Sequence, residues 1–450
     1  MSRLKDLEQF GQSVWLDYLT REMIQNGELA RLIAEDGIGG ITSNPAIFEK
    51  AIGGGREYDA DIKEMVDAGR DVGAIFRALA VHDIQLAADA LRPVYERTEG
   101  ADGFISMEVS PYLANDTAAT MDEAQSLWKE IARPNLMVKV PATEAGLPAI
   151  RDLTGQGLNI NITLLFSCDV YRQVAEAYLE GLERMPASAD LSRVSSVASF
   201  FVSRIDAKVD ALIDKRLEDA NGKETGALAA LASLRGKVAV ANAKEAYRIY
   251  KTIFAGPRWQ KLAARGARPQ RLLWASTSTK NKAYSDVLYV DTLIGPDTVN
   301  TMPPETMEAF RDHGTPKATI EEDIDDARKT LAALDDGGIS LDAVTKELVE
   351  EGVDKFADAA DKLYAALATK RLKLLNGSIV RVSETLGDAE DAVKAALADW
   401  THGGAVRRFW ARDKTLWTNS DEDKWMGWLD IAARERADLN QLNLFRDEID

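Results

Sequence analysis

The sequence predicts an α/β protein, a (β/α)₈ TIM barrel followed by a mainly helical C-terminal extension. Two kinds of segment alternate over roughly the first 300 residues: short, apolar stretches rich in β-branched residues, and longer stretches with helical spacing. The short stretches are continuously apolar, which is typical of parallel strands buried on both faces. Eight of them favour a closed barrel, and a doubly wound open sheet is the structural alternative.

The expected strands are the short apolar segments. They lie at residues 13–17, 39–42, 103–109, 136–140, 158–163, 194–202, 271–276 and 287–291. Apolar residues recur at steps of three and four in residues 78–95, 169–182 and 202–217, which predicts helices there. Barrel enzymes carry their chemistry at the carboxyl ends of the strands, so a site is expected at those ends.

The pattern changes beyond about residue 315. Residues 320–334 and 341–368 have the spacing of helices with acidic faces, and the stretch after Asn376 and Gly377 holds five of the nine tryptophans. We therefore expect a barrel domain at residues 1–370 and a C-terminal extension at residues 371–450. The tryptophans argue against a fully disordered extension.

The composition restricts the class of partner. With 73 acidic and 55 basic residues the formal charge is −18, which argues against binding to nucleic acid or to anionic membranes. The same charge disfavours anionic substrates, so a phosphate site would need its own cluster of positive groups. No apolar run is long enough to span a bilayer, and the N-terminus has no signal-peptide core.

The few cysteine and histidine residues restrict the chemistry. One cysteine excludes an intramolecular disulfide, and three histidines leave few ligands for a zinc or iron site. No spacing indicates any other metal site. We expect a cytoplasmic protein with no metal, no cofactor and no membrane contact. The sequence indicates no particular oligomeric state.

A lysine lies within one expected strand, in Leu-Met-Val-Lys-Val-Pro-Ala-Thr at residues 136–143. Burying an ammonium group is costly unless other groups compensate, and desolvation lowers a lysine's pKa, which makes a neutral amine nucleophile available. The alternative is a rim lysine whose amine reaches water. Pro141 ends the strand, so Lys139 is expected at the carboxyl end of the barrel, where chemistry is favoured.

Polar residues stand at the ends of other expected strands. Asp17 and Glu108 close two of them, Asn44 follows a third, and Asn161 and Thr163 lie in a fourth. Each alone is more often a helix cap or a hydrogen-bonded core group. Five such groups beside a lysine are harder to explain as caps, and we interpret them as one site.

A positive cluster is expected after the late strands. Arg204 follows the sixth strand, while Ser276 and Lys280 belong to the stretch after the seventh. An Arg and a Lys with hydroxyl and loop N–H groups can hold a phosphate dianion, and barrels often bind phosphate there. The alternative is that Arg204 begins a helix and pairs with Asp206 or Asp210.

Four of these stretches together resemble the transaldolase family. They are Gly-Ile-Thr-Ser-Asn-Pro-Ala at residues 40–46, Met-Val-Lys-Val-Pro-Ala-Thr at 137–143, Asn-Ile-Thr-Leu-Leu-Phe-Ser at 161–167 and Ser-Phe-Phe-Val-Ser-Arg at 199–204. The likeness covers roughly residues 1–370. It implies an enzyme of the pentose phosphate pathway that transfers a three-carbon ketol unit between sugar phosphates.

The resemblance implies catalytic roles at the matched positions. Lys139 would form a Schiff base with the ketone of a ketose phosphate, and Asp17 would exchange a proton with the C4 hydroxyl. Glu108 and Thr163 would hold a water that shuttles protons. The iminium acts as an electron sink, so the C3–C4 bond can break without a metal.

The implied substrate-binding residues are Asn44, Asn161, Ser199, Phe201, Arg204, Ser276 and Lys280. The two asparagines would bind hydroxyls of the dihydroxyacetone unit, the next two residues would line the pocket, and the last three would hold the phosphate. The implied donors are sedoheptulose 7-phosphate or fructose 6-phosphate. The implied acceptors are glyceraldehyde 3-phosphate or erythrose 4-phosphate.

The extension resembles a different protein. Residues 410–417 (Trp-Ala-Arg-Asp-Lys-Thr-Leu-Trp) and 425–430 (Trp-Met-Gly-Trp-Leu-Asp) are similar to the opening of the isomerase half of fused transaldolase/glucose-6-phosphate isomerases. Residues 371–450 are too few to complete that fold, so no isomerase activity is expected.

Two other functions remain open. A class I aldolase acting on a ketose phosphate would share the Schiff base and differ in releasing its ketol unit to water. A non-catalytic sugar-phosphate-binding barrel would leave Lys139, Asp17 and Glu108 together without a chemical purpose.

Overall fold

Eight parallel strands close into a barrel in chain order, with β8 paired to β1. The computed structural model describes residues 2–54, 56–220, 226–375 and 385–431 of the 450-residue chain. The strands are β1 Gln12–Leu16, β2 Ile38–Ile41, β3 Phe104–Glu108, β4 Leu136–Pro141, β5 Ile160–Leu165, β6 Ser196–Phe201, β7 Arg271–Ala275 and β8 Thr298–Met302. The predicted (β/α)₈ barrel is confirmed, and the open sheet is wrong.

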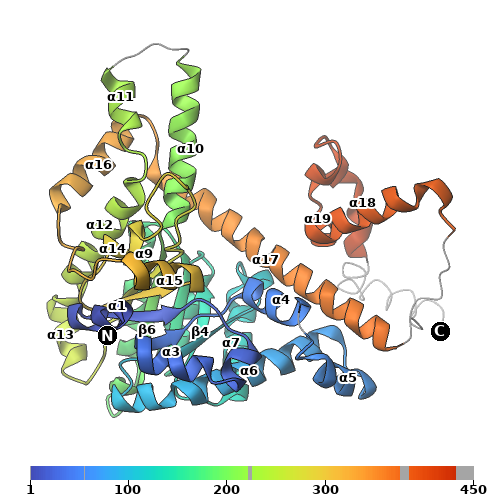
Figure 1. The fold of residues 1–450 in the computed structure, drawn as a ribbon, viewed down its shortest axis with the longest axis horizontal. Helices are drawn as coiled ribbons and strands as arrows, with labels where there is room; N and C mark the ends of the chain where they lie inside the picture. Colours follow the sequence, from blue (N-terminus) through green and yellow to red (C-terminus); the bar gives the residue numbers. More distant parts are fainter. Residues whose placement is uncertain (1, 55, 221–225, 376–384, 432–450) are drawn as a thin grey trace, which may run out of the picture.

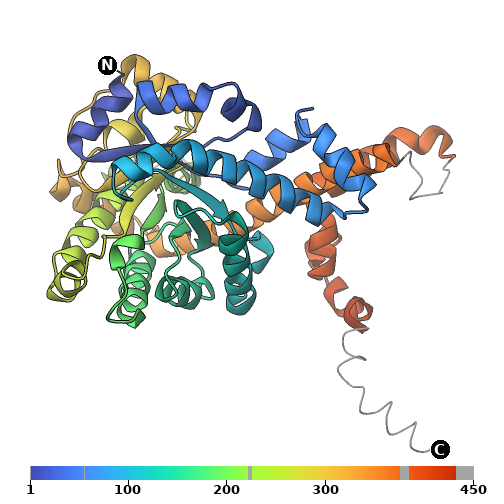
Figure 2. The same cartoon turned by 90° about the horizontal axis from the view of Figure 1, so that it is seen from below.

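Helices surround the barrel and continue into the extension (Figures 1 and 2). The α-helices are α1 Arg3–Asp6, α2 Arg21–Gln25, α3 Glu28–Asp36, α4 Pro45–Gly54, α5 Asp59–Asp67, α6 Val72–Arg97, α7 Thr117–Ile131, α8 Gly146–Gly155, α9 Cys168–Arg184, α10 Ser203–Asp219, α11 Gly226–Ala232, α12 Val238–Phe254, α13 Pro257–Ala263, α14 Leu288–Asp291, α15 Pro304–His313, α16 Ile324–Asp336, α17 Leu341–Leu374, α18 Glu390–His402 and α19 Ala405–Trp410. Short 3₁₀ turns are η1 Leu7–Phe10, η2 Pro111–Leu113, η3 Leu191–Arg193, η4 Gly387–Ala389, η5 Lys414–Leu416, η6 Glu422–Trp425 and η7 Gly427–Asp430. Among the described residues, every helix is too short or too polar to cross a bilayer.

The prediction of the eighth strand was wrong. Residues 288–291 form helix α14, and the strand lies further along the chain at Thr298–Met302. A short apolar run does not by itself distinguish a strand from one buried helical turn. Strand β8 was not predicted because it contains several polar residues. These residues are hydrogen-bonded inside the barrel: Gln12 donates to Thr298 Oγ1 (2.9 Å), and Thr277 donates to Asn300 Oδ1 (3.0 Å).

Close packing between β1 and β2 needs a glycine. A Cβ at Gly40 would come within 2.5 Å of the Trp15 indole, so only a residue without a side chain lets that ring lie against β2. Trp15 is fully buried in the main core, which joins the barrel interior to the surrounding helices. This packing holds together the strand ends that carry Asp17 and Thr42.

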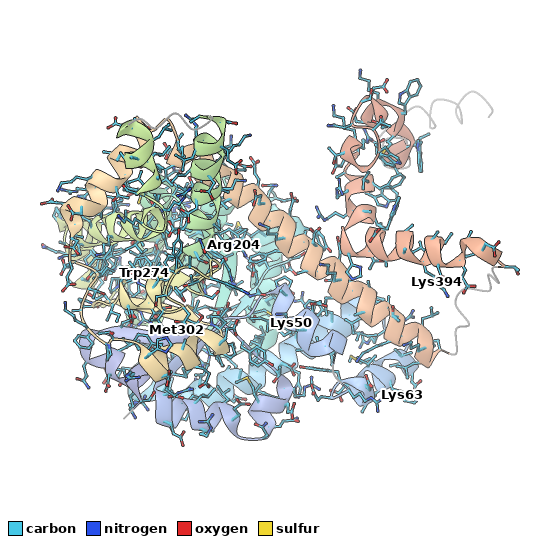
Figure 3. All side chains as sticks on the ribbon, turned by 45° about the horizontal axis from the view of Figure 1, so that its top comes forward. Lys50, Lys63, Arg204, Trp274, Met302 and Lys394 are labelled. Atoms are coloured by element: carbon cyan, nitrogen blue, oxygen red, sulfur yellow. The ribbon has the colours of Figure 1, made fainter. Side chains whose placement is uncertain are left out.

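Helix α17 links the barrel to the extension. It packs on α4, α5, α6 and α10 and runs outward to α18 and α19, which lie beside it away from the strands (Figure 1). In Figure 3, Lys394 on α18 is far from Arg204 in the barrel. Arg407 of α19 pairs with the Asp354, Asp358 and Asp361 carboxylates of α17. The helical character of the extension is confirmed for the described residues, while its boundary near residue 370 stays a prediction.

Candidate active site

Lys139 lies inside the barrel on β4, in register with Glu108 on β3 and Asn161 on β5. Only 5% of its surface is exposed. Its Nζ donates to the Ser43 carbonyl at 3.0 Å and lies 3.0 Å from Glu108 Oε2. The alternative of a rim lysine reaching water is therefore wrong.

Glu108 is the buried partner of this amine. Desolvation raises the pKa of the Glu108 carboxyl, and the charge of Lys139 opposes that rise. Thr163 lies at the end of β5, opposite Pro141. Its buried hydroxyl has no hydrogen-bond partner within the described part of the chain. Lys139, Glu108 and Thr163 thus form one group at neighbouring strand ends.

Asp17 directly follows β1. Thr42, which follows β2, donates a hydrogen bond from Oγ1 to Asp17 Oδ1 (2.7 Å) and also contacts the Thr301 hydroxyl (2.8 Å). Burial raises the pKa of Asp17, while the Thr42 hydrogen bond and the positive charges of Lys139 and Arg204 lower it. A carboxylate of raised pKa that faces a cavity can take up and return a proton.

The two asparagines are held differently. Asn44 Oδ1 accepts the backbone N–H of Ile47 (3.1 Å) and so begins helix α4. Asn161 is fully buried, donates to Ser106 Oγ (2.9 Å) and accepts from Ser199 Oγ (2.7 Å). Asn161 and Ser199 therefore form one hydrogen-bonded row across the barrel interior, and sequence reasoning missed Ser106 in it.

Arg204 supplies positive charge at the other side of the site. Its guanidinium carbon lies 5.3 Å from the Phe201 ring centroid, and one guanidinium nitrogen is buried with no hydrogen-bond partner among the described residues. Burial lowers the pKa of Arg204, opposed by the charges of nearby carboxylates. The alternative pairing is wrong, because Asp206 accepts from Ala239 N and Tyr289, and Asp210 from Gly236 N and Tyr284.

Ser276 and Lys280 lie in the loop after β7. The Ser276 backbone is left-handed (φ 56°), and its hydroxyl lies 3.0 Å from Ser203 Oγ, next to Arg204 in the chain. Lys280 donates to Ser278 Oγ at 2.7 Å. Burial and the charge of Arg204 lower the pKa of Lys280. The loop thus brings a second cation near the first, as expected for a phosphate site.

Most of the predicted residues line one cavity of about 220 Å³. The lining includes Asp17, Asn44, Lys139, Thr163, Ser199, Phe201, Arg204, Ser276 and Lys280. Glu108 and Asn161 stand behind this lining and contact it through Lys139 and Ser199. The other lining residues were not predicted from the sequence: Thr42, Ala275, Ser278, Thr301, Pro303, Glu305 and Phe356. Thr42 could have been found, since it precedes Asn44 in the same motif.

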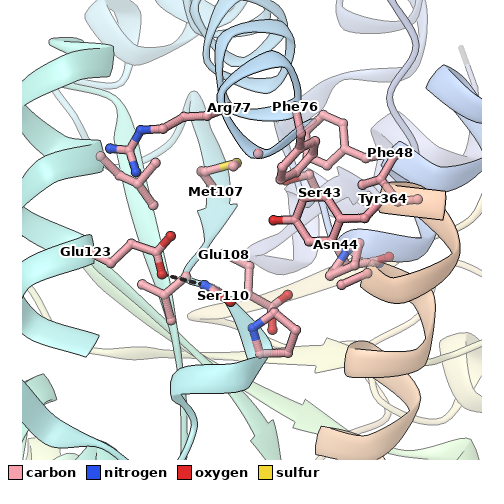
Figure 4. Close-up of a pocket in the computed structure, with 17 residues that line it drawn as sticks. Ser43, Asn44, Phe48, Phe76, Arg77, Met107, Glu108, Ser110, Glu123 and Tyr364 are labelled. Carbon is pink, nitrogen blue, oxygen red and sulfur yellow. Dashed lines mark hydrogen bonds between the residues drawn. The ribbon is translucent and has the colours of Figure 1, made fainter. Parts of the chain in front are cut away.

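A second, mainly apolar cavity of about 190 Å³ lies behind Glu108 and Asn44 (Figure 4). Phe48, Phe76 and Tyr364 contribute aromatic rings in edge-to-face contact. Ser110 N donates to Glu123 Oε2 (2.7 Å), and burial raises the pKa of Glu123. Within the described residues, no group of three His, Cys, Asp or Glu side chains is arranged to hold a metal ion.

Comparison with known proteins agrees with this geometry. The family profile of transaldolase/fructose-6-phosphate aldolase matches residues 14–367. The chain belongs to the transaldolase/fructose-6-phosphate aldolase family. A transaldolase of Trichodesmium erythraeum is 48% identical over 376 residues, which span 83% of this chain and 98% of that protein.

Other relatives carry the same name. Transaldolase 2 of a Nostoc species is 49% identical over 84% of this chain and 99% of its own length. A transaldolase of Thiobacillus denitrificans is 46% identical over 82% of this chain and 100% of its own length. The sequence-based assignment to the transaldolases, and with it the enzyme class, is confirmed. The roles of single residues stay predictions.

Proposed function

We propose that this protein is a transaldolase that transfers a dihydroxyacetone unit between sugar phosphates through a Schiff base on Lys139. The observation that carries the proposal is a buried amine 3.0 Å from Glu108 in a barrel cavity that also holds Asp17, Arg204 and Lys280. A nucleophile, two carboxyl groups and two cations are the groups that this transfer needs.

The first stage forms the covalent intermediate. Lys139 Nζ attacks the C2 ketone of a ketose phosphate, and loss of water from the carbinolamine gives an iminium. Because burial raises the pKa of Glu108, its carboxylate accepts a proton more readily than an ordinary glutamate. Glu108 and the Thr163 hydroxyl would hold the water that carries protons during these steps.

The second stage breaks and remakes a carbon–carbon bond. Asp17 takes the C4 hydroxyl proton, the C3–C4 bond breaks, and its electrons move into the iminium to leave an enamine on Lys139. An acceptor aldehyde is then attacked by C3, and Asp17 returns the proton. Asn44 and Ser199, which line the cavity, would hold hydroxyls of the three-carbon unit, and Asn161 would act on that unit through its hydrogen bond with Ser199.

The cationic side of the cavity supports phosphorylated substrates. Arg204 has a buried nitrogen without a hydrogen-bond partner in the described residues, and Lys280 and Ser276 lie on the adjacent loop. An arginine offers paired donors that fit a phosphate. Such substrates would place the enzyme in the pentose phosphate pathway, in the cytoplasm.

A borohydride trap tests the central step. After incubation with fructose 6-phosphate and reduction, a three-carbon adduct is expected on the peptide that contains Lys139. Lys139→Ala should lose the adduct and several orders of magnitude of activity. Lys244→Ala is the matched control, since Lys244 is also buried (7% exposed) but donates to the Glu322 carbonyl outside the cavity. A folded wild-type protein that gives no adduct would favour the sugar-phosphate-binding barrel.

We also propose that residues 371–450 form a separate unit, related to the opening segment of a glucose-6-phosphate isomerase domain. Exposed aromatic residues support a surface built to pack on further protein: Trp410, Trp417, Trp425 and Trp428 are 44–74% exposed. The unit carries no catalytic group of its own in this proposal. Measurable glucose-6-phosphate isomerase activity that copurifies with the protein would contradict it.

A further inference from the structure

Phe356 is a lining residue of the catalytic cavity that does not belong to the barrel. It comes from helix α17, is 8% exposed, and its ring centroid lies 5.9 Å from Lys139 Nζ. The Lys139 amine is therefore in contact with the Ser43 carbonyl and the Glu108 carboxylate, and it also lies near the Phe356 ring. Thr163, Ser199 and Phe201 line the same cavity.

Helix α17 holds this ring in a fixed place. One turn before Phe356, Gly352 lies so close to the end of β5 that a Cβ there would come within 2.7 Å of Leu164 Cδ2. Leu164 directly follows Thr163 in the chain. Lys208 of α10 makes ion pairs of 2.6 Å with both Glu347 and Glu351 of α17. The helix is thus anchored on the barrel by contacts on the N-terminal side of Phe356.

The electrostatic contribution of the ring is modest. At 5.9 Å the distance is close to the limit for attraction between a cation and an aromatic face. The larger effect is on water, because an apolar ring offers no hydrogen bond and occupies the space beside the reacting nitrogen. Polar groups near the same amine are the Glu108 carboxylate, 3.0 Å from Lys139 Nζ, and the Thr163 hydroxyl in the cavity lining, and these could order a single water.

We infer that Phe356 is a specificity-determining residue that keeps the Lys139-bound three-carbon unit from water and so favours transfer over release. This inference rests on the proposed Schiff-base function. Release requires a proton on C3 of the enamine, addition of water to C2 of the resulting iminium, and cleavage of the C2–N bond. The products are free dihydroxyacetone and the Lys139 amine.

The test compares release with transfer in the full chain. Fructose 6-phosphate is supplied with and without erythrose 4-phosphate, and dihydroxyacetone and sedoheptulose 7-phosphate are measured. The release-to-transfer ratio should rise as the side chain shrinks through Phe356→Leu, Phe356→Val and Phe356→Ala. The rise should reach at least about tenfold in the alanine variant, the scale of a lost buried aromatic contact. Should the alanine variant not fold, the valine variant carries the test.

A ratio has the advantage that it does not depend on how much of the protein is folded. Leu348→Ala is the matched control, because Leu348 is a buried residue of the same helix (3% exposed) that does not line the cavity. Its ratio should equal that of the wild type. An unchanged ratio in the valine and alanine variants, or an equal rise in the leucine variant, would overturn the inference.

Borohydride trapping separates the two proposals. If wild-type protein gives no adduct on Lys139, the proposed function itself fails. If the wild type and the Phe356 variants all give the adduct but release stays low in the variants, only the role of Phe356 fails.

Discussion

Asp17 and Glu108 are two carboxyl groups in one site whose surroundings differ. Burial raises the pKa of both, but Glu108 is opposed mainly by Lys139 and Asp17 mainly by the Thr42 hydroxyl. Asp17 has to be ionised to take the C4 proton. Activity should therefore fall as the pH drops through its pKa, and the acidic limb should lie above the range of an ordinary aspartate.

Removing the Thr42 hydroxyl should move that limb. The 2.7 Å hydrogen bond from Thr42 to the Asp17 carboxylate lowers the pKa of Asp17, and Thr42→Val removes this bond. The pKa should then rise, and the acidic limb of kcat/KM should shift upward by about one pH unit, since a hydrogen bond to a charged group is worth roughly 1.5–3 kcal/mol. Thr42→Ser keeps the hydroxyl and should keep the wild-type profile. An unmoved limb in the valine variant would show that another group sets it.

Which site residues could be predicted depends on where they lie in the chain. Lys139, Asp17 and Asn44 lie at or beside strand ends, where an unexpected polar residue stands out against apolar neighbours. Ser106 is one small polar residue inside a strand, and Phe356 is one apolar residue in an amphipathic helix. Neither differs from ordinary core packing until the fold brings it to the cavity.

Whole strands, like single residues, are hard to predict when their hydrogen-bond partners are distant in sequence. Seven strands could be predicted because apolar residues predominate in them. In β8 three of the five residues are polar, namely Thr298, Asn300 and Thr301, and their hydrogen-bond partners lie on β1 and just after β2 and β7. Such partners are distant in sequence. The apolar run at 287–291 fits a strand as well as a buried helical turn, because the two have the same composition.

The join between α10, α12 and α14 depends on one buried carboxyl group. Asp206 accepts from the Ala239 N–H (2.8 Å) and the Tyr289 hydroxyl (2.9 Å), and burial raises the pKa of Asp206 to about 6 from the ordinary 3.8. Between these two values the folded protein keeps a proton that the unfolded chain has lost. Stability from this group is therefore greatest at low pH and declines as the pH rises through about 6.

Asp206→Asn should remove this dependence, because the amide stays neutral. The wild type loses stability as the pH rises from about 4 to about 7, while the variant does not. The free energy of unfolding of the variant minus that of the wild type should therefore increase over this range, by at most about 3 kcal/mol. Urea unfolding at both pH values measures it. Asp214→Asn on the same helix, where the carboxylate is 52% exposed and paired with Arg235, is the control and should show little change. A constant difference between Asp206→Asn and wild type would contradict the argument.

At the scale of the molecule, the net negative charge of the chain opposes the binding of negatively charged substrates. The chain has a formal charge of −18, yet its proposed substrates are anions. The fold resolves this locally, since Arg204 and Lys280 both line the cavity from the late strands. Two carboxylates, Asp17 and Glu305, line the same cavity, and other acidic residues lie away from it, including Asp354, Asp358 and Asp361 on α17, where Arg407 of the extension pairs with them.

The extension should be dispensable for folding and transfer. The family profile ends at residue 367, and the Trichodesmium erythraeum relative matches over 98% of its own length while covering 83% of this chain. A chain of residues 1–375 keeps α17, and so keeps Phe356 and its anchoring contacts. Its kcat/KM should equal that of the full chain. The free energy of unfolding should fall by only about 1–2 kcal/mol, as the α17 aspartates lose a partly exposed partner.

Arg407→Ala in the full chain separates the ion pairs from the rest of the extension. It should show the same small loss of stability as the shortened chain, with unchanged kcat/KM, because both leave Asp354, Asp358 and Asp361 without the guanidinium. Thermal unfolding followed by circular dichroism measures both. An inactive chain of residues 1–375 beside an active Arg407→Ala variant would mean that the extension holds α17, and with it Phe356, over Lys139 by contacts other than these ion pairs.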